Sequence, residues 1–99
     1  LVDETTQSSA EYHAMAYRTA PNATVMGSTT AGADGNVSSI KLPGGIMTMI
    51  SGIGVYYPDG KETQRIGIVP DIVVKPTIEG FNKGKDEVLE KALEFVRKD

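Results

Sequence analysis

The sequence has 99 residues, enough for one small domain. Its 13 acidic side chains outnumber the 10 basic ones, for a formal charge of −3, which argues against a basic surface for nucleic-acid phosphates. The lack of cysteine excludes disulfides, thiolate metal sites and a thiol nucleophile, and the apolar runs fall far short of the ~20 residues of a membrane-spanning helix.

The first predicted element is a helix that begins after Ser8 and ends before Pro21. Ser8 and Glu11 have the spacing of a capping box, in which a hydroxyl and a carboxylate bind the free amides at the start of a helix. Apolar residues recur at helical spacing on two adjoining faces of this segment. We therefore expect the helix to be buried on more than one side.

Strands and turns are predicted for the middle of the chain, where all 11 glycines lie. Short apolar runs bounded by turn residues predict strands over 23–26, 36–42, 46–57 and 72–74, with a further extended segment over 62–66. A turn is predicted at Pro43-Gly44-Gly45. Gly52 and Gly54 predict a bulge or a close backbone approach within the long run.

The last predicted element is an amphipathic helix over about 85–97. The chain shows no internal repeat and no interdomain linker. With helices at both ends and strands between them, the sequence predicts an α/β fold in which helices flank a strand-rich sheet.

Ser8 is the first candidate for chemistry, because a serine between a strand and a helix presents its hydroxyl on a sharp turn. The free amides and the positive end of the helix dipole would favour an oxyanion there. The same residues also suit a simpler role, in which Ser8 only caps the helix. The two roles do not exclude each other.

Several other polar residues are interpreted as structural. His13 is the only histidine, but it lies more than one helical turn beyond Ser8, so we predict a packed or hydrogen-bonded helix residue rather than a base for that hydroxyl. The loop 27–35 has the glycine spacing of a phosphate loop but an acid in place of its lysine, which argues against nucleotide binding. Three aspartates beside glycine or proline are interpreted as turn residues: Asp34, Asp59 and Asp71.

Four motifs in order resemble those of the C-terminal-processing, or tail-specific, serine peptidases and their tricorn-like relatives. They occupy residues 1–11, 25–32, 56–60 and 67–74. The resemblance implies part of a ClpP/crotonase-like core, so we expect residues 1–99 to form the C-terminal portion of a peptidase catalytic domain whose upstream part is absent from this chain. It also favours a periplasmic or cell-envelope location for the full-length protein.

The resemblance implies roles for two neighbouring serines. In the family the nucleophile lies three residues before the glutamate of the first motif, which implies Ser8. The next residue donates its backbone N–H to the oxyanion hole, which implies Ser9. The lysine of the Ser–Lys branch would fall at Ala33, so the sequence fits the tricorn-like branch, whose base is a histidine upstream of the nucleophile.

A supporting glutamate is also implied, just before the last motif. Glu62 is the carboxylate in the extended segment there, and Gln64 would share its strand face. The resemblance leaves open which of the two fills the family position.

The implied function is that of a serine endopeptidase acting on peptides or proteins through an acyl-enzyme at Ser8, with no metal or other cofactor. The isolated chain is expected to be inactive because its base would lie upstream. A non-catalytic ligand- or peptide-binding module of the same fold is the alternative. A third possibility is a structural fragment that folds only with partners, and self-association of the chain is expected.

Overall fold

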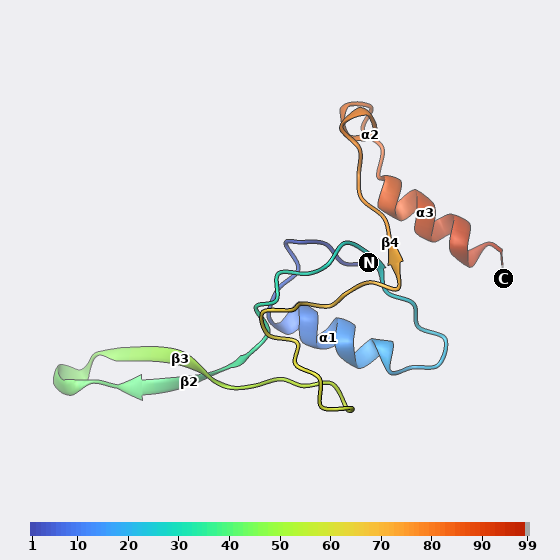
Figure 1. Ribbon diagram of the computed structural model, residues 1–99. Coiled ribbons are helices and arrows are strands. Elements are labelled where there is room, and N and C mark those ends of the chain that lie inside the picture. The colour runs from blue at the N-terminus through green and yellow to red at the C-terminus, as the bar shows by residue number, and fades with distance from the viewer. Residues whose placement is uncertain (99) are drawn as a thin grey trace.

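Helix α1 (Ser9–Arg18) runs through the middle of the computed structural model, which describes residues 1–98 (Figure 1). The predicted start after Ser8 and end before Pro21 are confirmed. Only Glu11 and Met15 of the helix are buried, whereas Tyr17 is 70% exposed. The prediction of burial on more than one side is therefore wrong, because the core packs against a single stripe of the helix.

Strand β1 (Met26–Gly27) lies between two other segments of the chain. It pairs in parallel with β4 (Ile72–Val73), and Val2 forms a parallel bridge to Gly27. Gly27 has φ 133°, and a Cβ atom there would lie 1.8 Å from the Val2 carbonyl oxygen, so glycine is required for this pairing. The predicted strand over 72–74 is confirmed but shorter, whereas β1 begins only at the last residue of the strand predicted over 23–26.

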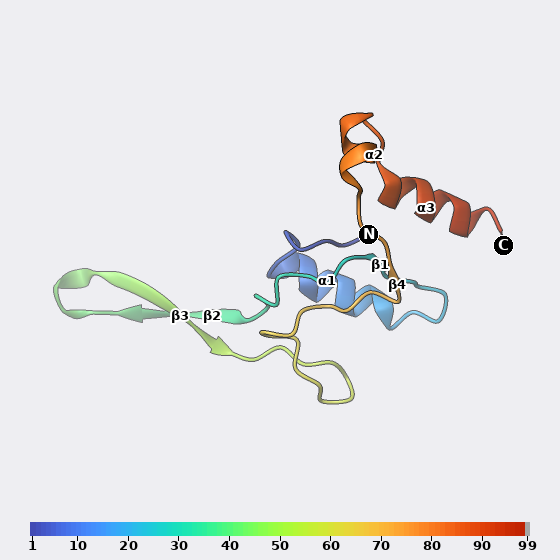
Figure 2. The same ribbon diagram turned by 45° about the horizontal axis from the view of Figure 1, so that its top comes forward.

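Strands β2 (Asn36–Lys41) and β3 (Met47–Ile53) form an antiparallel hairpin that projects from the rest of the molecule as an arm (Figures 1 and 2). The 3₁₀ turn η1 (Pro43–Gly45) joins them at the predicted place. The register shifts near the base of the arm, where two residues of β3, one of them Gly52, lie opposite one residue of β2. The predicted bulge is confirmed.

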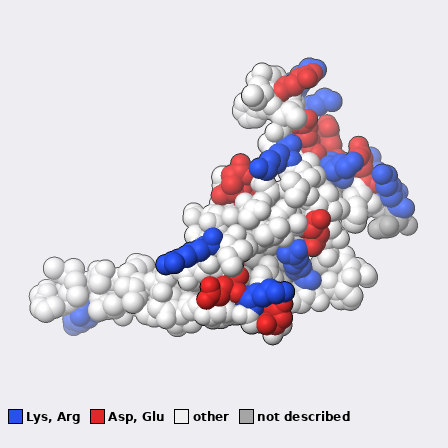
Figure 3. Space-filling view, viewed as in Figure 1, with Lys and Arg blue, Asp and Glu red and all other residues white. Residues whose placement is uncertain are grey.

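The hairpin arm is apolar and exposed. Every residue of β3 is exposed, and Lys41 is the only charged residue between positions 36 and 53, so the arm is almost free of blue and red in Figure 3. The molecule measures 57 × 35 × 17 Å, and its radius of gyration of 17.1 Å exceeds the ~13 Å of a compact domain of this length. Much apolar surface is therefore left uncovered.

The segment before β4 turns where an extended chain was predicted. Glu62 forms a single bridge to Tyr56, and residues 64–66 then make a turn in which Arg65 has φ 68°. The Gly67 N–H closes this turn on the Thr63 carbonyl oxygen at 2.7 Å. The turn lets the Arg65 N–H reach the Gly32 carbonyl oxygen at 2.6 Å, a contact that a straight strand would not make.

Two helices follow β4, on the side of the molecule away from the arm (Figures 1 and 2). Helix α3 (Glu87–Val96) falls within the predicted range, and Asp86 caps it by accepting from the Leu89 N–H at 2.9 Å. Helix α2 (Ile78–Asn82) was not predicted, because five residues are too few to show helical periodicity.

The core that unites these elements is small. It consists of four buried apolar side chains, each from a different segment of the chain: Val2, Met15, Val25 and Ile68. Helices combined with paired strands confirm the predicted α/β class, with the strands in two separate two-stranded sheets. Within residues 1–98 the structure contains no helix of the length and apolar character needed to cross a bilayer.

Asp71 fastens the end of α1 to this core. Its carboxylate accepts from the Val25 N–H at 2.8 Å and from the Arg18 guanidinium, which also donates to the Val69 carbonyl oxygen at 2.8 Å. The Val25 amide, and next Arg18, lower the pKa of Asp71. Asp71 is therefore a tertiary contact and not only the turn residue inferred from the sequence.

We expect Asp71→Asn to lower the free energy of unfolding at pH 7 by about 1 kcal/mol, a modest loss because the carboxylate is more than a third exposed. Since the pKa is lowered in the folded state, the stabilisation exists above the ordinary value of 3.8 and is lost as the pH falls through the folded-state pKa. Urea denaturation at several pH values measures the free energy of unfolding and its dependence on pH. Glu90→Gln, at an exposed position of α3, is the control; equal effects of both variants would contradict the assignment.

Candidate active site

Ser8 occupies a strained turn immediately before α1. Its backbone has φ 54° and ψ −124°, a conformation that costs a non-glycine residue about 1–3 kcal/mol. The residue is exposed, so its hydroxyl stands at the surface of the turn. Strained serines between a strand and a helix are typical of nucleophiles, whose hydroxyl must project from the backbone.

The chain before Ser8 is held by a polar turn. The Asp3 carboxylate accepts from the Thr5 N–H at 2.9 Å and from the Thr6 N–H at 3.1 Å. The Ala31 N–H then donates to the Thr6 carbonyl oxygen at 3.0 Å. The approach to Ser8 is thereby tied to the loop that follows β1.

The buried Glu11 carboxylate fixes the turn from the other side. Its exposed fraction is 0%, and it accepts hydrogen bonds from four donors: the Ser8 N–H at 3.0 Å, the Thr30 hydroxyl at 2.5 Å, the Gly32 N–H at 2.7 Å and the Ala33 N–H at 2.9 Å. Such charge-assisted bonds offset the desolvation of the carboxylate. One side chain thus joins the Ser8 turn to the loop after β1.

The same network reaches the segment before β4. The Thr30 hydroxyl that donates to Glu11 also accepts from the Ile68 N–H at 2.7 Å, and both side chains are buried. Gly32, with φ 71°, lies so close to the turn at 64–66 that a Cβ atom would be 2.9 Å from the Arg65 backbone. Three of the four sequence motifs therefore meet around one carboxylate.

The capping box predicted at Ser8 is present, but its two halves differ. Glu11 binds the Ser8 N–H, whereas the Ser8 side chain makes no cap hydrogen bond of regular geometry. The Glu11 N–H donates instead to the Ser8 carbonyl oxygen at 2.9 Å. As the first residue of α1, Ser9 has an N–H without an intrahelical acceptor. The Ser8 hydroxyl and the Ser9 N–H are therefore both positioned to bind an external ligand.

A pocket of about 360 Å³ lies beside this turn. It is lined by residues from the start of α1, the start of β2 and the end of the hairpin: Ser8, Ser9, Tyr12, Asp34, Gly35, Asn36 and Val55. A carbonyl bound here could meet the Ser8 hydroxyl and the positive end of α1 together.

Asp34 is the buried acid of this pocket. Only 4% of its surface is exposed, and among residues 1–98 its Oδ2 atom has no hydrogen-bond partner. Burial, and then the negative charge of Glu11, raise the pKa of Asp34, while the Thr63 hydroxyl opposes them. The sequence-based interpretation as a turn residue is wrong, because the bonds of Glu11 to Gly32 and Ala33 draw this part of the loop inward.

His13 lies beside Ser9 and not at Ser8. Its Nδ1 atom is 2.6 Å from the Ser9 carbonyl oxygen and 3.3 Å from the Ser9 hydroxyl. The short contact to a carbonyl requires a proton on Nδ1, so this nitrogen cannot accept one from the hydroxyl. The prediction of a hydrogen-bonded helix histidine is confirmed.

Glu62 and Gln64 both line a pocket of about 190 Å³ beside the end of the hairpin. Glu62 is exposed and lines a pocket of about 770 Å³ together with Arg18 and Lys61. Gln64 is half-buried, and its side-chain amide packs against Gly35, at the edge of the Ser8 pocket. The two side chains thus border one small pocket although the chain turns after Thr63, and Gln64 alone of the pair also reaches the edge of the Ser8 pocket.

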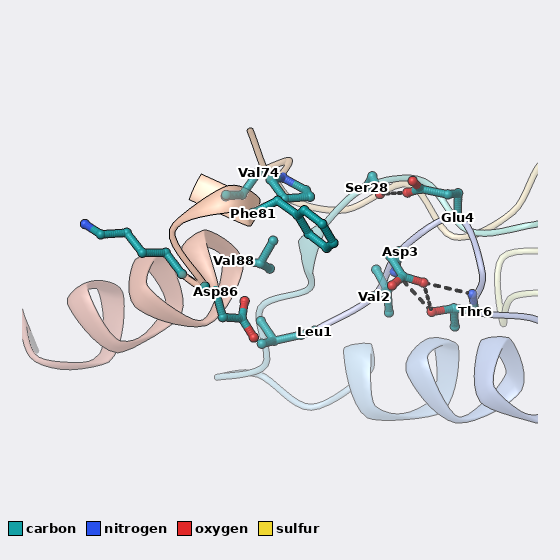
Figure 4. A pocket seen from close by; sticks show the side chains of 13 residues that line it. Leu1, Val2, Asp3, Glu4, Thr6, Ser28, Val74, Phe81, Asp86 and Val88 are labelled. Carbon is teal, nitrogen blue, oxygen red and sulfur yellow. Dashed lines mark hydrogen bonds between the residues drawn. The ribbon is translucent and has the colours of Figure 1, made fainter. Parts of the chain in front are cut away.

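A further pocket, of about 570 Å³, lies between the start of the chain and the C-terminal helices (Figure 4). Apolar side chains line most of it, including Val74, Phe81 and Val88. Ser8 is not among its lining residues. Within residues 1–98 no group of three or more His, Asp or Glu side chains is arranged to hold a metal ion.

The sequence did not predict two features of the site. Glu11 was expected only to complete a cap, although it also binds the loop after β1, and Asp34 was not expected in the Ser8 pocket. For Asp34 a signal did exist: it directly follows Ala33, the position at which the second motif would place a catalytic lysine.

Glu11→Gln should destabilise the fold by about 2–4 kcal/mol, because the amide NH₂ group would face backbone N–H donors and leave at least one of them buried and unpaired. Urea denaturation measures the loss. The matched control is Glu94→Gln on the exposed face of α3, which should leave stability nearly unchanged. Similar midpoints for both variants would refute the role of Glu11.

Ser8→Gly should be more stable than Ser8→Ala by about 1 kcal/mol, because glycine relieves the positive φ while alanine keeps the strained Cβ. Ser8→Ala alone should cost little of the ~0.5–2 kcal/mol expected for a helix cap, since the hydroxyl makes no regular cap bond. Thermal denaturation of the two variants and the parent compares them. A lower midpoint for Ser8→Gly than for Ser8→Ala would show that the Ser8 backbone is not strained.

Comparison with known protein families gives one match. The model of peptidase family S41 matches residues 1–74, which include α1, both sheets and every residue of the Ser8 pocket. No curated protein matches the chain at a significant level.

Solved structures of much longer proteins are similar to this chain. A candidate peptidase from Parabacteroides merdae is 32% identical with a TM-score of 0.77, over 91% of this chain and 28% of that one. Mature CPAF complexed with lactacystin is 26% identical with a TM-score of 0.80, over 96% and 19%. The tricorn protease is 16% identical with a TM-score of 0.81, over 94% and 9%, and shows the fold alone. The chain thus spans less than a third of each.

Proposed function

This chain belongs to peptidase family S41, and on that premise we propose that the full-length protein is a serine endopeptidase whose nucleophile is Ser8. The observation that carries the proposal is the strained and exposed turn at Ser8, beside a pocket and at the start of α1. A capping serine gains nothing from a φ of 54°, whereas a nucleophile gains an exposed hydroxyl.

The reaction would proceed through an acyl-enzyme. A base takes the proton of the Ser8 hydroxyl as its oxygen bonds to the substrate carbonyl carbon, and the carbonyl oxygen becomes an oxyanion. The Ser9 N–H and the dipole of α1 stabilise that charge. The C–N bond then breaks, the base protonates the leaving amine, and water releases the acyl group by the reverse sequence.

The base is proposed to come from outside these residues. His13 donates from Nδ1 to a backbone carbonyl, and among residues 1–98 no imidazole or lysine side chain lines the Ser8 pocket. A histidine of the upstream region fits this need, with the present chain as the C-terminal portion of the catalytic domain. The supporting role of Glu62 or Gln64 and self-association of the chain stay predictions.

Ser8→Ala in the full-length protein should abolish peptide hydrolysis, and Ser9→Ala should retain most of it, because Ser9 contributes its backbone N–H and not its hydroxyl. A fluorogenic peptide assay measures turnover. Mass spectrometry after treatment with a fluorophosphonate should locate the label on Ser8. If Ser9→Ala is the inactive variant, the nucleophile is displaced by one residue.

Two comparisons complete this experiment. The isolated 99-residue chain should not be labelled on the timescale of the full-length protein, because a neutral serine hydroxyl without a base is a poor nucleophile. Rapid labelling of that chain would place the base within these residues. A full-length protein that binds peptides but neither hydrolyses them nor reacts at Ser8 would favour the non-catalytic binding module.

A further inference from the structure

Asp34 lines the same pocket as Ser8, yet neither the sequence resemblance nor the family match gives it a role. We propose that Asp34 is the positioning acid of the Ser8 site: its free Oδ2 atom accepts a hydrogen bond from the imidazole that acts as base toward the Ser8 hydroxyl. The inference rests on the proposed serine-peptidase function and adds the carboxylate that orients the base.

The burial of Asp34 shows that a hydrogen-bond donor is required. A carboxylate that is 96% buried needs donors for both oxygens, and within residues 1–98 Oδ2 has none. The nearby Glu11 carboxylate adds repulsion, because it carries the same charge and its own oxygens are already occupied. A donor that gains positive charge during the reaction would be stabilised here most strongly.

An imidazole suits this place better than other donors. A neutral imidazole donates a hydrogen bond from one ring nitrogen while the other accepts a proton, so one group can satisfy Asp34 and activate Ser8 at once. A lysine ammonium beside the same carboxylate would be held in its charged form and would be a poor base. When the imidazole takes the Ser8 proton, the imidazolium remains paired with Asp34, which keeps its own charge.

The positions of Asp34 and Ser8 are coupled by the fold. Glu11 accepts from the Ser8 N–H through Oε2, and the same oxygen accepts from the N–H of Ala33, the residue before Asp34. The nucleophile and the residue before the acid are therefore held to one buried atom, each through a single hydrogen bond. Such a short linkage provides the fixed geometry that proton transfer requires.

Glu62 and Gln64, the other two candidates for orienting the base, fit less well. Glu62 is exposed and does not line the Ser8 pocket, while Gln64 reaches the pocket edge at Gly35 but carries no charge. An uncharged amide can orient an imidazole but cannot stabilise the imidazolium. Asp34 is the group that offers both burial in the pocket and a negative charge.

The test compares Asp34→Asn, Asp34→Glu, Glu62→Gln and Gln64→Ala in the full-length protein, with Asp59→Asn in an exposed turn as the matched control. We expect Asp34→Asn to lower kcat by about 10²- to 10⁴-fold with KM nearly unchanged, because the amide would hold the imidazole in the wrong tautomer. Asp34→Glu should recover part of kcat. The thermal midpoint of Asp34→Asn should be equal or higher, since a buried charge is removed.

Normal turnover in Asp34→Asn together with a large loss in Glu62→Gln or Gln64→Ala would overturn the assignment. A rise in KM alone would also overturn it, because it would indicate a substrate contact, and loss of folding would indicate a structural role. Ser8→Ala distinguishes a failure of the role of Asp34 from a failure of the proposed function. If that variant is inactive and Asp34→Asn is normal, only the role of Asp34 fails; if Ser8→Ala remains active, the proposed function itself fails.

Discussion

The buried carboxylate of Glu11 is the interaction on which the rest of this structure depends. An ionised side chain without solvent exposure persists only when its oxygens are saturated by donors, and here the donors come from the Ser8 turn and the loop after β1. Through the Thr30 hydroxyl the same network reaches the Ile68 backbone. With so small an apolar core, polar contacts of this kind define the relative positions of the segments.

Strain at Ser8 is sustained by that network. A positive φ at a residue with a Cβ relaxes unless its neighbours hold it, and Ser8 is held by Glu11 on one side and by the Asp3 turn on the other. The strained turn leaves Ser8 exposed and places the Ser9 N–H at the free end of α1. Such backbone strain has no use in a helix cap, but it suits a nucleophile.

The exposed surfaces agree with a chain that spans less than a third of the proteins it resembles. The β2–β3 arm and the outer face of α1 carry apolar side chains, among them Met49 and Tyr17, without a covering layer in residues 1–98. In contrast, the elements around Ser8 are already packed and hydrogen-bonded. The arrangement at the turn is thus formed within these residues, whereas no imidazole or lysine side chain of residues 1–98 lines its pocket.

The sequence alone determined the local features, namely the limits of α1, the η1 turn, the Gly52 bulge and the α/β class, because caps, turns and bulges depend on neighbours in the chain. It could not show that α1 buries a single stripe, that residues 64–66 form a turn, or that Asp34 is buried in the Ser8 pocket. These features follow from contacts between distant segments. Only the tertiary structure decided which polar groups share the Ser8 pocket, since one buried carboxylate, Glu11, draws them together.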